Sequence, residues 1–315
     1  MQPTITIPLP DPSVFQATAR RLATHGPRRL QSQFVPLARD PRYTRTLHLH
    51  LVNRTWRPQM PSRRTVSTGR GRSRTLARLS PIDRVLDATL APLAAHWLDG
   101  VLGPSVHGWR RGHGCRSALR SLLRTPLHPD AVWMQVDIAR LFAELPHRRL
   151  LETAHQLGGA DWAYILSRAL ASWGTRRGHG LPEGASLSPI LANVALAQGV
   201  DRALDDWLRR GTLLRYARYG DDIVMVLPSD LNEDRLWASL DALFAAEGLR
   251  RNRRKSVVHR GPGPWRILGQ LVERGKEDAA SPFTVRSGAS QRSAGVARRR
   301  SSCTAPRPPR RLARP

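Results

Sequence analysis

The chain has 315 residues, enough for one large domain or two modest ones with a real core. Its 51 lysine and arginine residues against 24 acidic residues give a formal net charge of +27, which favours a polyanionic partner, nucleic acid first. Two cysteines, Cys115 and Cys303, cannot form a zinc site by themselves and suggest no disulfide framework. With no secretory signal and no apolar run that could span a bilayer, we expect a cytoplasmic protein without a membrane partner.

The first third of the chain is basic and has few regular patterns. One short helix is predicted over 14–24, within a segment rich in Pro and Arg. Arg, Ser and Gly crowd residues 54–78, which predicts a mobile basic hairpin or loop. Ser80 and Pro81 are typical of a helix start, as the N-cap and the first helical residue. We expect Pro92 to kink or interrupt the helix that follows.

The middle of the chain alternates strand and helix patterns. An apolar strand is predicted over 131–137, with the sequence AVWMQVD, and it ends on a carboxylate. Helices are predicted over 146–156 and 161–173, and a third over 189–208 with Ser188 as its N-cap.

Residues 213–228, with the sequence LLRYARYGDDIVMVLP, are typical of a β-hairpin because two apolar runs flank a tight polar centre. Gly220 supplies the permissive backbone of a tight turn, and the adjacent carboxylates of Asp221 and Asp222 follow it. Adjacent acids repel each other, and Mg²⁺ relieves this when one or two carboxylates and substrate phosphates bind it. A solvated Asp-Asp turn without a ligand explains the same residues.

A helix over 232–246 and short strands over 256–259 and 266–272 complete an α+β layout, with an antiparallel sheet backed by helices. If the strand that ends at Asp137 neighbours the hairpin, three carboxylates converge at one edge, as two-metal phosphoryl transfer requires. Residues 279–315 contain no acidic residue and predict a disordered basic tail.

Seven sequence blocks stand in order over about 60% of the chain. They are Arg74 to Arg78 with Asp83 to Val85, Ser105 to Gly112, Asp137 to Phe142, Gly180 to Asn193, Tyr219 to Asp222, Gly248 to Lys255, and Trp265 to Gly269. Together they resemble the bacterial reverse transcriptases of the group II intron and retron type. One block alone would be weak evidence, whereas seven in the correct order are specific.

The resemblance implies a right-hand polymerase, with a palm built on a ferredoxin-like antiparallel sheet with helices, with fingers, and with a reduced or absent thumb. The implied division is an N-terminal basic segment (1–53), fingers (54–130), a palm (131–235) that includes fingers and palm helices at 146–175, the end of the palm with the primer grip and a thumb stub (236–278), and the disordered basic tail (279–315).

The implied reaction is RNA-directed DNA synthesis, in which a primer 3′-hydroxyl attacks the α-phosphate of a dNTP and releases pyrophosphate. Asp137 and Asp221 would be the principal ligands of Mg²⁺, or of Mn²⁺, with Asp222 as the third carboxylate and the backbone carbonyl of Ile138 as a further ligand. The other implied site residues are Arg74 and Arg78 as a triphosphate clamp, Phe142 as a sugar gate, Glu183, Gly184 and Asn193 in the nucleotide-positioning block, and Lys255. Lys255 is a candidate proton donor to pyrophosphate, although an ordinary surface lysine is the commoner case for a lysine at this distance in the sequence.

The chain departs from the family pattern at three places. Glu183 stands where the family usually has Gln, and a carboxylate there repels a triphosphate. Gly220 stands where Ala or Met is usual, which suggests a looser turn. Little sequence follows Gly269 for a full thumb, so we expect a structured RNA or an accessory protein as a partner besides the RNA template, the primer and dNTPs.

Two other functions fit the same blocks. An RNA-dependent RNA polymerase shares the palm and the Gly-Asp-Asp turn. Phe142, five residues after Asp137, favours DNA because an aromatic ring excludes a 2′-hydroxyl, although a core phenylalanine fits too. The second alternative function is a non-catalytic one, an RNA-binding or splicing cofactor derived from a reverse transcriptase. Glu183 favours this alternative, and the three intact carboxylates disfavour it. A mobile intron, a retron, a CRISPR-linked array and an antiphage defence system are all compatible with the sequence.

Overall fold

The computed structural model describes residues 8–69, 72–124, 130–261, 263–274 and 283–286. The chain divides into two compact units, each assembled from segments that are separate in the sequence. The helical unit comprises residues 1–103, 138–203 and 237–251. The sheet unit comprises residues 104–137, 204–236 and 252–315. The sequence analysis divided the chain into consecutive ranges, whereas each unit here draws on three segments.

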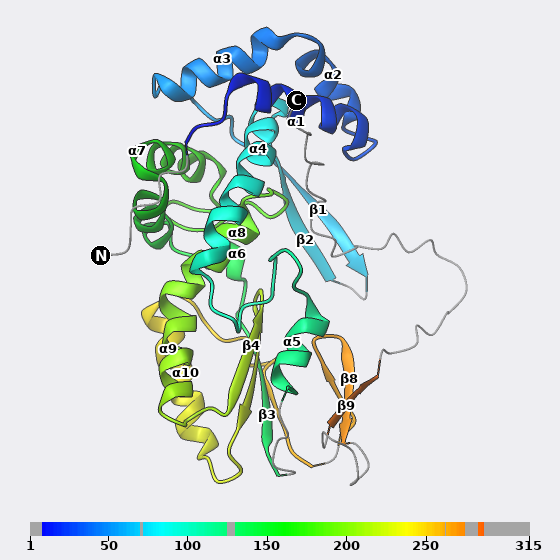
Figure 1. The fold of residues 1–315 in the computed structure, drawn as a ribbon, viewed down its shortest axis with the longest axis vertical. Coiled ribbons are helices and arrows are strands. Elements are labelled where there is room, and N and C mark those ends of the chain that lie inside the picture. Colours follow the sequence, from blue (N-terminus) through cyan, green and yellow to red (C-terminus); the bar gives the residue numbers. More distant parts are fainter. Residues whose placement is uncertain (1–7, 70–71, 125–129, 262, 275–282, 287–315) are drawn as a thin grey trace, which may run out of the picture. The chain divides into compact units, whose positions relative to one another are not determined.

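Three short helices open the helical unit, and the sequence predicted only the first of them. They are α1 (Pro12–His25), α2 (Gln31–Arg39) and α3 (Pro41–Val52), and the first two also pack on α4 (Pro81–Leu98) (Figure 1). A buried hydrogen bond of 2.9 Å from Thr44 of α3 to Gln16 of α1 joins two of these helices. Pro36 lies inside α2, and proline in that position concealed the helical pattern.

A two-stranded antiparallel hairpin, β1 (Ser62–Gly69) and β2 (Arg72–Arg78), follows in the same unit (Figure 1). It occupies the stretch rich in Arg, Ser and Gly for which the sequence predicted a hairpin or a loop. Most of its described side chains are exposed, but Ala77 is buried. The backbone N–H of Ala77 donates to the carbonyl of Glu183 at 2.7 Å, which fastens β2 to a loop far along the chain.

The start of α4 confirms the prediction from the sequence. Ser80 Oγ accepts the N–H of Asp83 at 3.2 Å, and Pro81 is the first helical residue. Pro92 does not end the helix, which continues to Leu98 before a short 3₁₀ turn, η1 (Asp99–Val101). Pro92 is exposed, and a carbonyl that loses its intrahelical donor to proline is hydrated on an exposed face.

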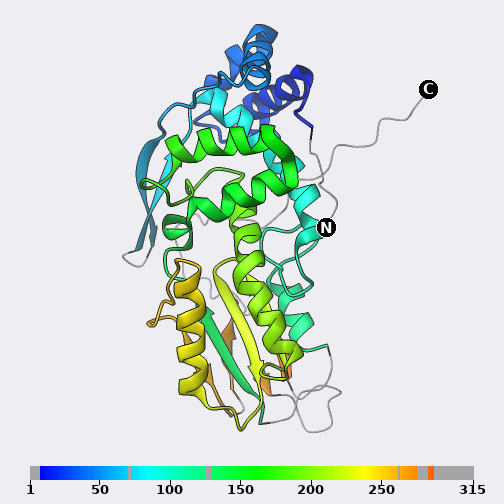
Figure 2. The ribbon, with the colours of Figure 1, turned by 90° about the vertical axis from the view of Figure 1, so that its left-hand side faces the viewer.

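From residue 141 onward the helices are α6 (Leu141–Glu144), α7 (His147–Trp173), α8 (Ser188–Leu196), the π-helical turn η2 (Ala197–Asp201), α9 (Arg202–Arg209) and α10 (Glu233–Ala246). Gly159 divides α7 with a non-helical φ of 65° and ψ of −162°, so α7 corresponds to the two predicted helices (Figure 2). Ser188 is the first residue of α8 and not its N-cap, which is Leu187; the Oγ of Ser188 donates to the carbonyl of Pro182 at 2.8 Å. Within the described ranges, no helix combines the length and the apolarity needed to cross a bilayer.

The sheet unit is built on a four-stranded antiparallel sheet with the strand order β4-β5-β3-β6. These strands are β3 (Val132–Asp137), β4 (Arg215–Tyr219), β5 (Asp222–Leu227) and β6 (Val257–His259). β3 and β5 pair from Val132 opposite Leu227 to Asp137 opposite Asp222. Every residue of β5 after Asp222 is buried, as expected for a strand in a sheet that is covered on both faces.

One face of this sheet packs on α5 (Cys115–Leu122) and on a three-stranded antiparallel sheet, β7 (Trp265–Ile267), β8 (Gln270–Arg274) and β9 (Phe283–Arg286). Trp133 of β3 and Trp265 of β7 meet in this core with ring centroids 6.2 Å apart. β9 lies within the segment predicted to be a disordered tail, and it pairs with β8 along its whole length. The rest of that predicted tail, 279–282 and 287–315, lies outside the described residues.

Candidate active site

Three carboxylates lie at one end of the β3–β5 pair in the sheet unit. Asp137 ends β3 directly opposite Asp222, the first residue of β5, and Asp221 is the turn residue immediately before Asp222. Tyr219 pairs with Asp222 across the hairpin, so Gly220 and Asp221 form a two-residue turn. The strand that ends at Asp137 and the hairpin are therefore neighbours, and this brings the three carboxylates together at one edge of the sheet, as the sequence predicts for such neighbours.

Negative charge is concentrated at this position. Burial, together with the neighbouring charges of Asp221 and Asp137, raises the pKa of the Asp222 carboxyl to about 6, while Lys255 acts in the opposite direction. Lys255 Nζ forms an ion pair with Asp137 Oδ2 at 2.6 Å, and about half of the lysine side chain is exposed. The sequence analysis considered Lys255 as a proton donor or a surface residue, and the structure places it as the counter-ion of a candidate metal ligand.

The end of β3 is held by the segment that carries Lys255. The backbone N–H of Asn252 donates to the carbonyl of Asp137 at 2.8 Å, and the N–H of Asp137 donates to Ser256 Oγ at 3.2 Å. The N–H of Lys255 and that of Ser256 both donate to the carbonyl of Asn252, which closes a compact turn. This turn therefore fixes Lys255 beside Asp137 through backbone contacts as well as through charge.

The donor set suits a divalent cation. Carboxylate oxygens are the ligands that Mg²⁺ prefers. Burial is the main cause of the raised pKa of Asp222, and the charges of Asp221 and Asp137, which add to it, are what a cation would offset. In the part of the chain that the structure describes, no three His, Cys, Asp or Glu side chains are gathered into a complete metal cage. Mg²⁺ is commonly held by one or two carboxylates plus substrate phosphates, so a complete cage is not required for it to bind.

The loop from Ser105 to Gly114, here called the GWR loop after Gly108 to Arg110, is attached to the edge of β4. The N–H of Arg218 donates to the carbonyl of Ser105, and the N–H of His107 donates to the carbonyl of Arg218, both at 2.8 Å. This loop contains one of the seven sequence blocks, Ser105 to Gly112, whose pattern alone indicated no role for its individual residues. The structure brings it to the strand that leads into the Gly220 turn.

His107 is the buried anchor of the GWR loop. Its Nδ1 lies 3.0 Å from Ser117 Oγ and its Nε2 lies 3.1 Å from Ser121 Oγ, so both ring nitrogens face α5. Burial, together with the nearby charges of His113 and Arg110, lowers the pKa of His107 to about 4. The ring is therefore neutral at physiological pH, and it ties the loop to the helix beneath it.

The predicted nucleotide-binding residues belong to the helical unit. Arg74 and Arg78 are exposed on β2, and the contact of Ala77 with Glu183 brings the 182–188 loop alongside this strand. A Cβ atom at Gly184, whose φ is +103°, would lie 3.3 Å from the carbonyl oxygen of Ala77, so the approach is close. The structure thus gathers two arginines, Glu183 and Gly184 in one region of the helical unit.

Three further predicted residues of the helical unit have different surroundings. Phe142 is half-buried on α6, and its carbonyl accepts the N–H of Leu181 at 2.6 Å. Asn193 is only 1% exposed on α8, so a nucleotide could reach its side chain only if neighbouring side chains moved. Ile138 follows Asp137 in the chain, is fully buried, and forms an isolated antiparallel bridge with Arg251.

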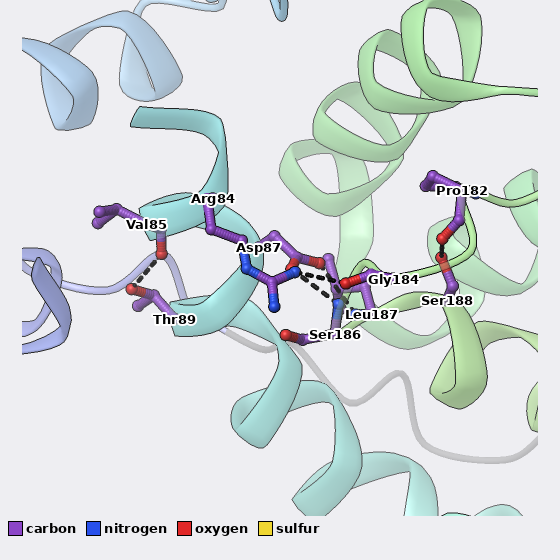
Figure 3. A network of polar contacts seen from close by, with 9 residues as sticks. All are labelled: Arg84, Val85, Asp87, Thr89, Pro182, Gly184, Ser186, Leu187 and Ser188. Carbon is purple, nitrogen blue, oxygen red and sulfur yellow. Dashed lines mark hydrogen bonds and ion pairs between the residues drawn. The ribbon is translucent and has the colours of Figure 1, made fainter. Parts of the chain in front are cut away.

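A buried carboxylate that the sequence analysis did not single out fixes the 182–188 loop (Figure 3). Asp87 of α4 accepts the backbone N–H groups of Ser186 at 2.7 Å and of Leu187 at 2.9 Å. It also pairs with Arg84 at 2.9 Å, and the same guanidinium nitrogen donates to the carbonyl of Gly184 at 2.7 Å. A signal was present in the sequence, since an acid one turn after Asp83 lies on the apolar stripe of the helix.

A palm-type antiparallel sheet, with carboxylates at a strand end and at the adjoining hairpin turn, defines the class of right-hand nucleotidyltransferases. The fold is similar to the structure of apo telomerase from Candida tropicalis, with a TM-score of 0.54 and 13% identity over 75% of this chain and 50% of that chain. At that identity the likeness concerns the fold alone. Residues 63–272 match the family model described as reverse transcriptase (RNA-dependent DNA polymerase), and the chain belongs to this family.

Two curated proteins are similar to part of the chain. An "uncharacterized 91 kDa protein in cob intron" of Schizosaccharomyces pombe is 30% identical over 146 residues, which are 44% of this chain and 18% of that protein. A "putative COX1/OXI3 intron 1 protein" of Saccharomyces cerevisiae is 25% identical over 147 residues, 44% of this chain and 17% of that protein. The chain thus spans less than a fifth of the length of these relatives. The α+β prediction with a palm and fingers is confirmed, whereas the expected bacterial subtype is not what these two relatives represent.

Replacing Asp87 by Ala should destabilise the protein strongly. The change removes the acceptor of two backbone N–H groups and leaves Arg84 without its partner, at a cost of about 3–5 kcal/mol in the free energy of unfolding. Urea unfolding measures this loss. The matched control is Asp161→Ala, which breaks an exposed pair with Arg54 and should cost at most about 1 kcal/mol. Similar small losses in both variants would contradict a fixing role for Asp87.

Acid should destabilise the protein through His107. Because its pKa is lowered to about 4 in the folded protein, the unfolded chain takes up a proton at a higher pH than the folded one does. The stabilisation is complete above about pH 6.5 and is lost as the pH falls toward 4, by up to about 3 kcal/mol.

Melting temperatures at pH 7.5 and pH 5 measure this effect, and His107→Gln should reduce their difference. Part of the difference will persist because burial also lowers the pKa of His147 and of His259. An exposed histidine, His25, provides the control, since His25→Gln should leave the difference as it is in the wild type. An unchanged pH dependence in His107→Gln would show that this ring titrates freely.

Proposed function

We propose that the chain is an RNA-directed DNA polymerase that adds dNTPs to a primer on an RNA template by two-metal phosphoryl transfer. The observation that carries the proposal is the register that sets Asp137 opposite Asp222, with Asp221 next to it. When bound, the metal ions activate the primer hydroxyl and stabilise charge on the reacting phosphate. Asp137, Asp221 and Asp222 would hold Mg²⁺, with Mn²⁺ as an alternative and with the carbonyl of Ile138 as a further ligand.

The remaining site residues handle the substrate. Arg74 and Arg78 are exposed guanidinium groups on one strand and would clamp the triphosphate, since arginine binds phosphate in a bidentate manner. Glu183 lies beside that strand and would reduce the affinity of the clamp for a triphosphate. Lys255 Nζ lies beside a candidate metal ligand, Asp137, and would give a proton to the departing pyrophosphate. Asn193 would support the nucleotide-positioning loop from within.

The partners follow from the charge of the chain and from its relatives. A net charge of +27 supports binding of template and primer along their phosphates. The similarity to two proteins described as intron proteins supports an intron-type retroelement in which a structured RNA or an accessory protein assists the enzyme. The retron and antiphage-defence assignments, and the cytoplasmic location, remain predictions from the sequence.

Removing a carboxylate should abolish synthesis and spare binding. Asp221→Ala and Asp222→Ala should each lower primer extension by roughly 10³-fold or more, because a two-metal site fails when a ligand is lost. Filter binding of an RNA template–DNA primer duplex should change by about twofold at most, since affinity depends on phosphate contacts. Asp230→Ala, which removes an exposed acid of the same unit, should act like the wild type. Binding that falls in step with extension would make the two acids structural.

Phe142→Ala should relax the choice of sugar. A ring beside C2′ of the incoming nucleotide leaves no room for a hydroxyl, so its removal should raise incorporation of ribonucleotides relative to deoxyribonucleotides. The measurement is extension with competing rNTPs and dNTPs, together with the melting temperature. Phe142 is half-buried, so Phe142→Ala should lower the free energy of unfolding by less than a core phenylalanine would, for which about 3–5 kcal/mol is expected.

The matched control for the sugar gate is Phe244→Ala, which removes a fully buried ring from the same unit. That variant should be strongly destabilised and keep the sugar preference of the wild type. If Phe142→Ala behaves like Phe244→Ala, Phe142 is a packing residue. A wild-type enzyme that prefers ribonucleotides from the outset would favour the RNA polymerase alternative.

A further inference from the structure

The turn that carries the carboxylates is covered by an aromatic ring from another loop. Gly220 has a φ of +69°, and a Cβ atom built on it would lie 2.8 Å from Cη2 of Trp109 and 3.2 Å from its Cζ3. Cβ atoms do not approach other atoms so closely, so the six-membered ring of Trp109 takes the space that any side chain at position 220 would need. The turn is therefore closely packed, in contrast to the looser turn that the sequence suggested for Gly220.

The backbone of the GWR loop also contacts this turn. A Cβ atom on Gly108 would clash with the backbone nitrogen of Gly220 and would lie 3.1 Å from the carbonyl carbon of Tyr219. Gly108 and Gly220 thus allow the GWR loop and the hairpin turn to be in contact, because a side chain at either position would push the loop and the turn apart. The contact lies immediately before Asp221.

Several interactions hold Trp109 against the turn. Its φ of +54° lies in the left-handed region, which residues other than glycine seldom adopt and which the surrounding contacts must maintain. The two backbone hydrogen bonds with β4 and the buried His107 anchor the loop on one side of Trp109. Arg110, the next residue in the chain, reaches back across the loop, and its Nη1 donates to the carbonyl of Val106 at 3.0 Å. Fully buried Arg218 completes the contact, since its Nη1 donates to the carbonyl of Gly220 at 3.2 Å.

We propose that Trp109 is a positioning residue of the active site, whose indole ring packs on Gly220 and holds the Gly220–Asp221 turn, and with it Asp222, against the end of β3. The inference rests on the proposed function, because it gives those two acids the role of metal ligands. Three neighbouring carboxylates repel one another, and a glycine in the turn offers little resistance to that repulsion. Trp109 is 38% exposed as a residue, and its ring supplies the resistance from outside the hairpin.

A double-mutant cycle tests the packing. Gly220→Ala should lower the rate of single-turnover extension by about tenfold or more, because the methyl group meets the ring as well as an unfavourable φ. In the Gly220→Ala background, Trp109→Ala should cost about threefold or more less than it costs in the wild type, since the methyl group has already displaced the ring from the turn. Gly211→Ala is the matched control, as Gly211 lies in the same unit with a φ of +76° and no atom within 4 Å of an added Cβ. It should change the rate by about twofold at most.

Metal affinity provides a readout besides activity. In electron paramagnetic resonance titrations with Mn²⁺ alone, Trp109→Ala should bind the ion about fivefold or more weakly, while Trp109→Phe should recover most of the affinity. In extension assays Trp109→Ala should lower kcat with little change in KM for dNTP, because the ring acts on the turn and not on the nucleotide. If Gly220→Ala and the double variant both fail to fold, the comparison of Trp109→Ala with Trp109→Phe decides the proposal.

The outcomes separate this inference from the proposed function. Unchanged Mn²⁺ affinity and kcat in Trp109→Ala, or effects of Trp109→Ala and Gly220→Ala that simply add in the double variant, overturn the positioning role even in an active polymerase. A wild-type protein that makes no DNA but shows the coupled loss of Mn²⁺ affinity overturns the polymerase and leaves the role of Trp109 in place.

Discussion

The antiparallel pairing of β3 with β5 is the constraint on which the rest of the sheet unit depends. The register runs from Val132 opposite Leu227 to Asp137 opposite Asp222. A shift of one residue would turn every side chain of a strand to the other face, exchanging the residues that pack on α5 for those that pack elsewhere. Burial of both faces therefore fixes the register, and the register fixes which acids stand side by side. The apolar core and the charged end of the strands are two consequences of one alignment.

Like charges directly opposite each other weaken a sheet, so the position of Asp137 and Asp222 has a cost in stability. The chain offsets that cost with local contacts. Lys255 pairs with Asp137, and the Asn252 and Ser256 contacts hold the end of β3 in place. Repulsion among carboxylates that surrounding contacts must counteract is typical of a binding or catalytic site. A strand end and a turn with a purely structural role would not need three acids side by side.

Much of the fold could be predicted because its signals are local. Ser80 and Pro81 mark the start of α4, and the alternation around Gly220 marks the hairpin. The misses have physical causes: Pro36 disguised α2, and β9 lies in a basic segment whose pairing with β8 depends on long-range contacts. The carboxylates of the site were visible from their motifs. The roles of Asp87, His107 and Trp109 were not, since they depend on partners about 10 to 110 residues away that only folding brings near, and the place of Asp87 on the apolar stripe of α4 marks burial without naming a partner.

One face of α4 links loops from distant parts of the chain. Asp83 accepts the amide of Gln59 at 2.9 Å, and one turn later Asp87 accepts the amides of Ser186 and Leu187. These three amides belong to loops, yet their acceptors are buried carboxylates of a helix. Their exchange with solvent deuterium is therefore governed by the opening of α4 and not by the fraying of the loops themselves. The helix and both loops should open as one cooperative unit, so that opening of one loop is coupled through α4 to opening of the other.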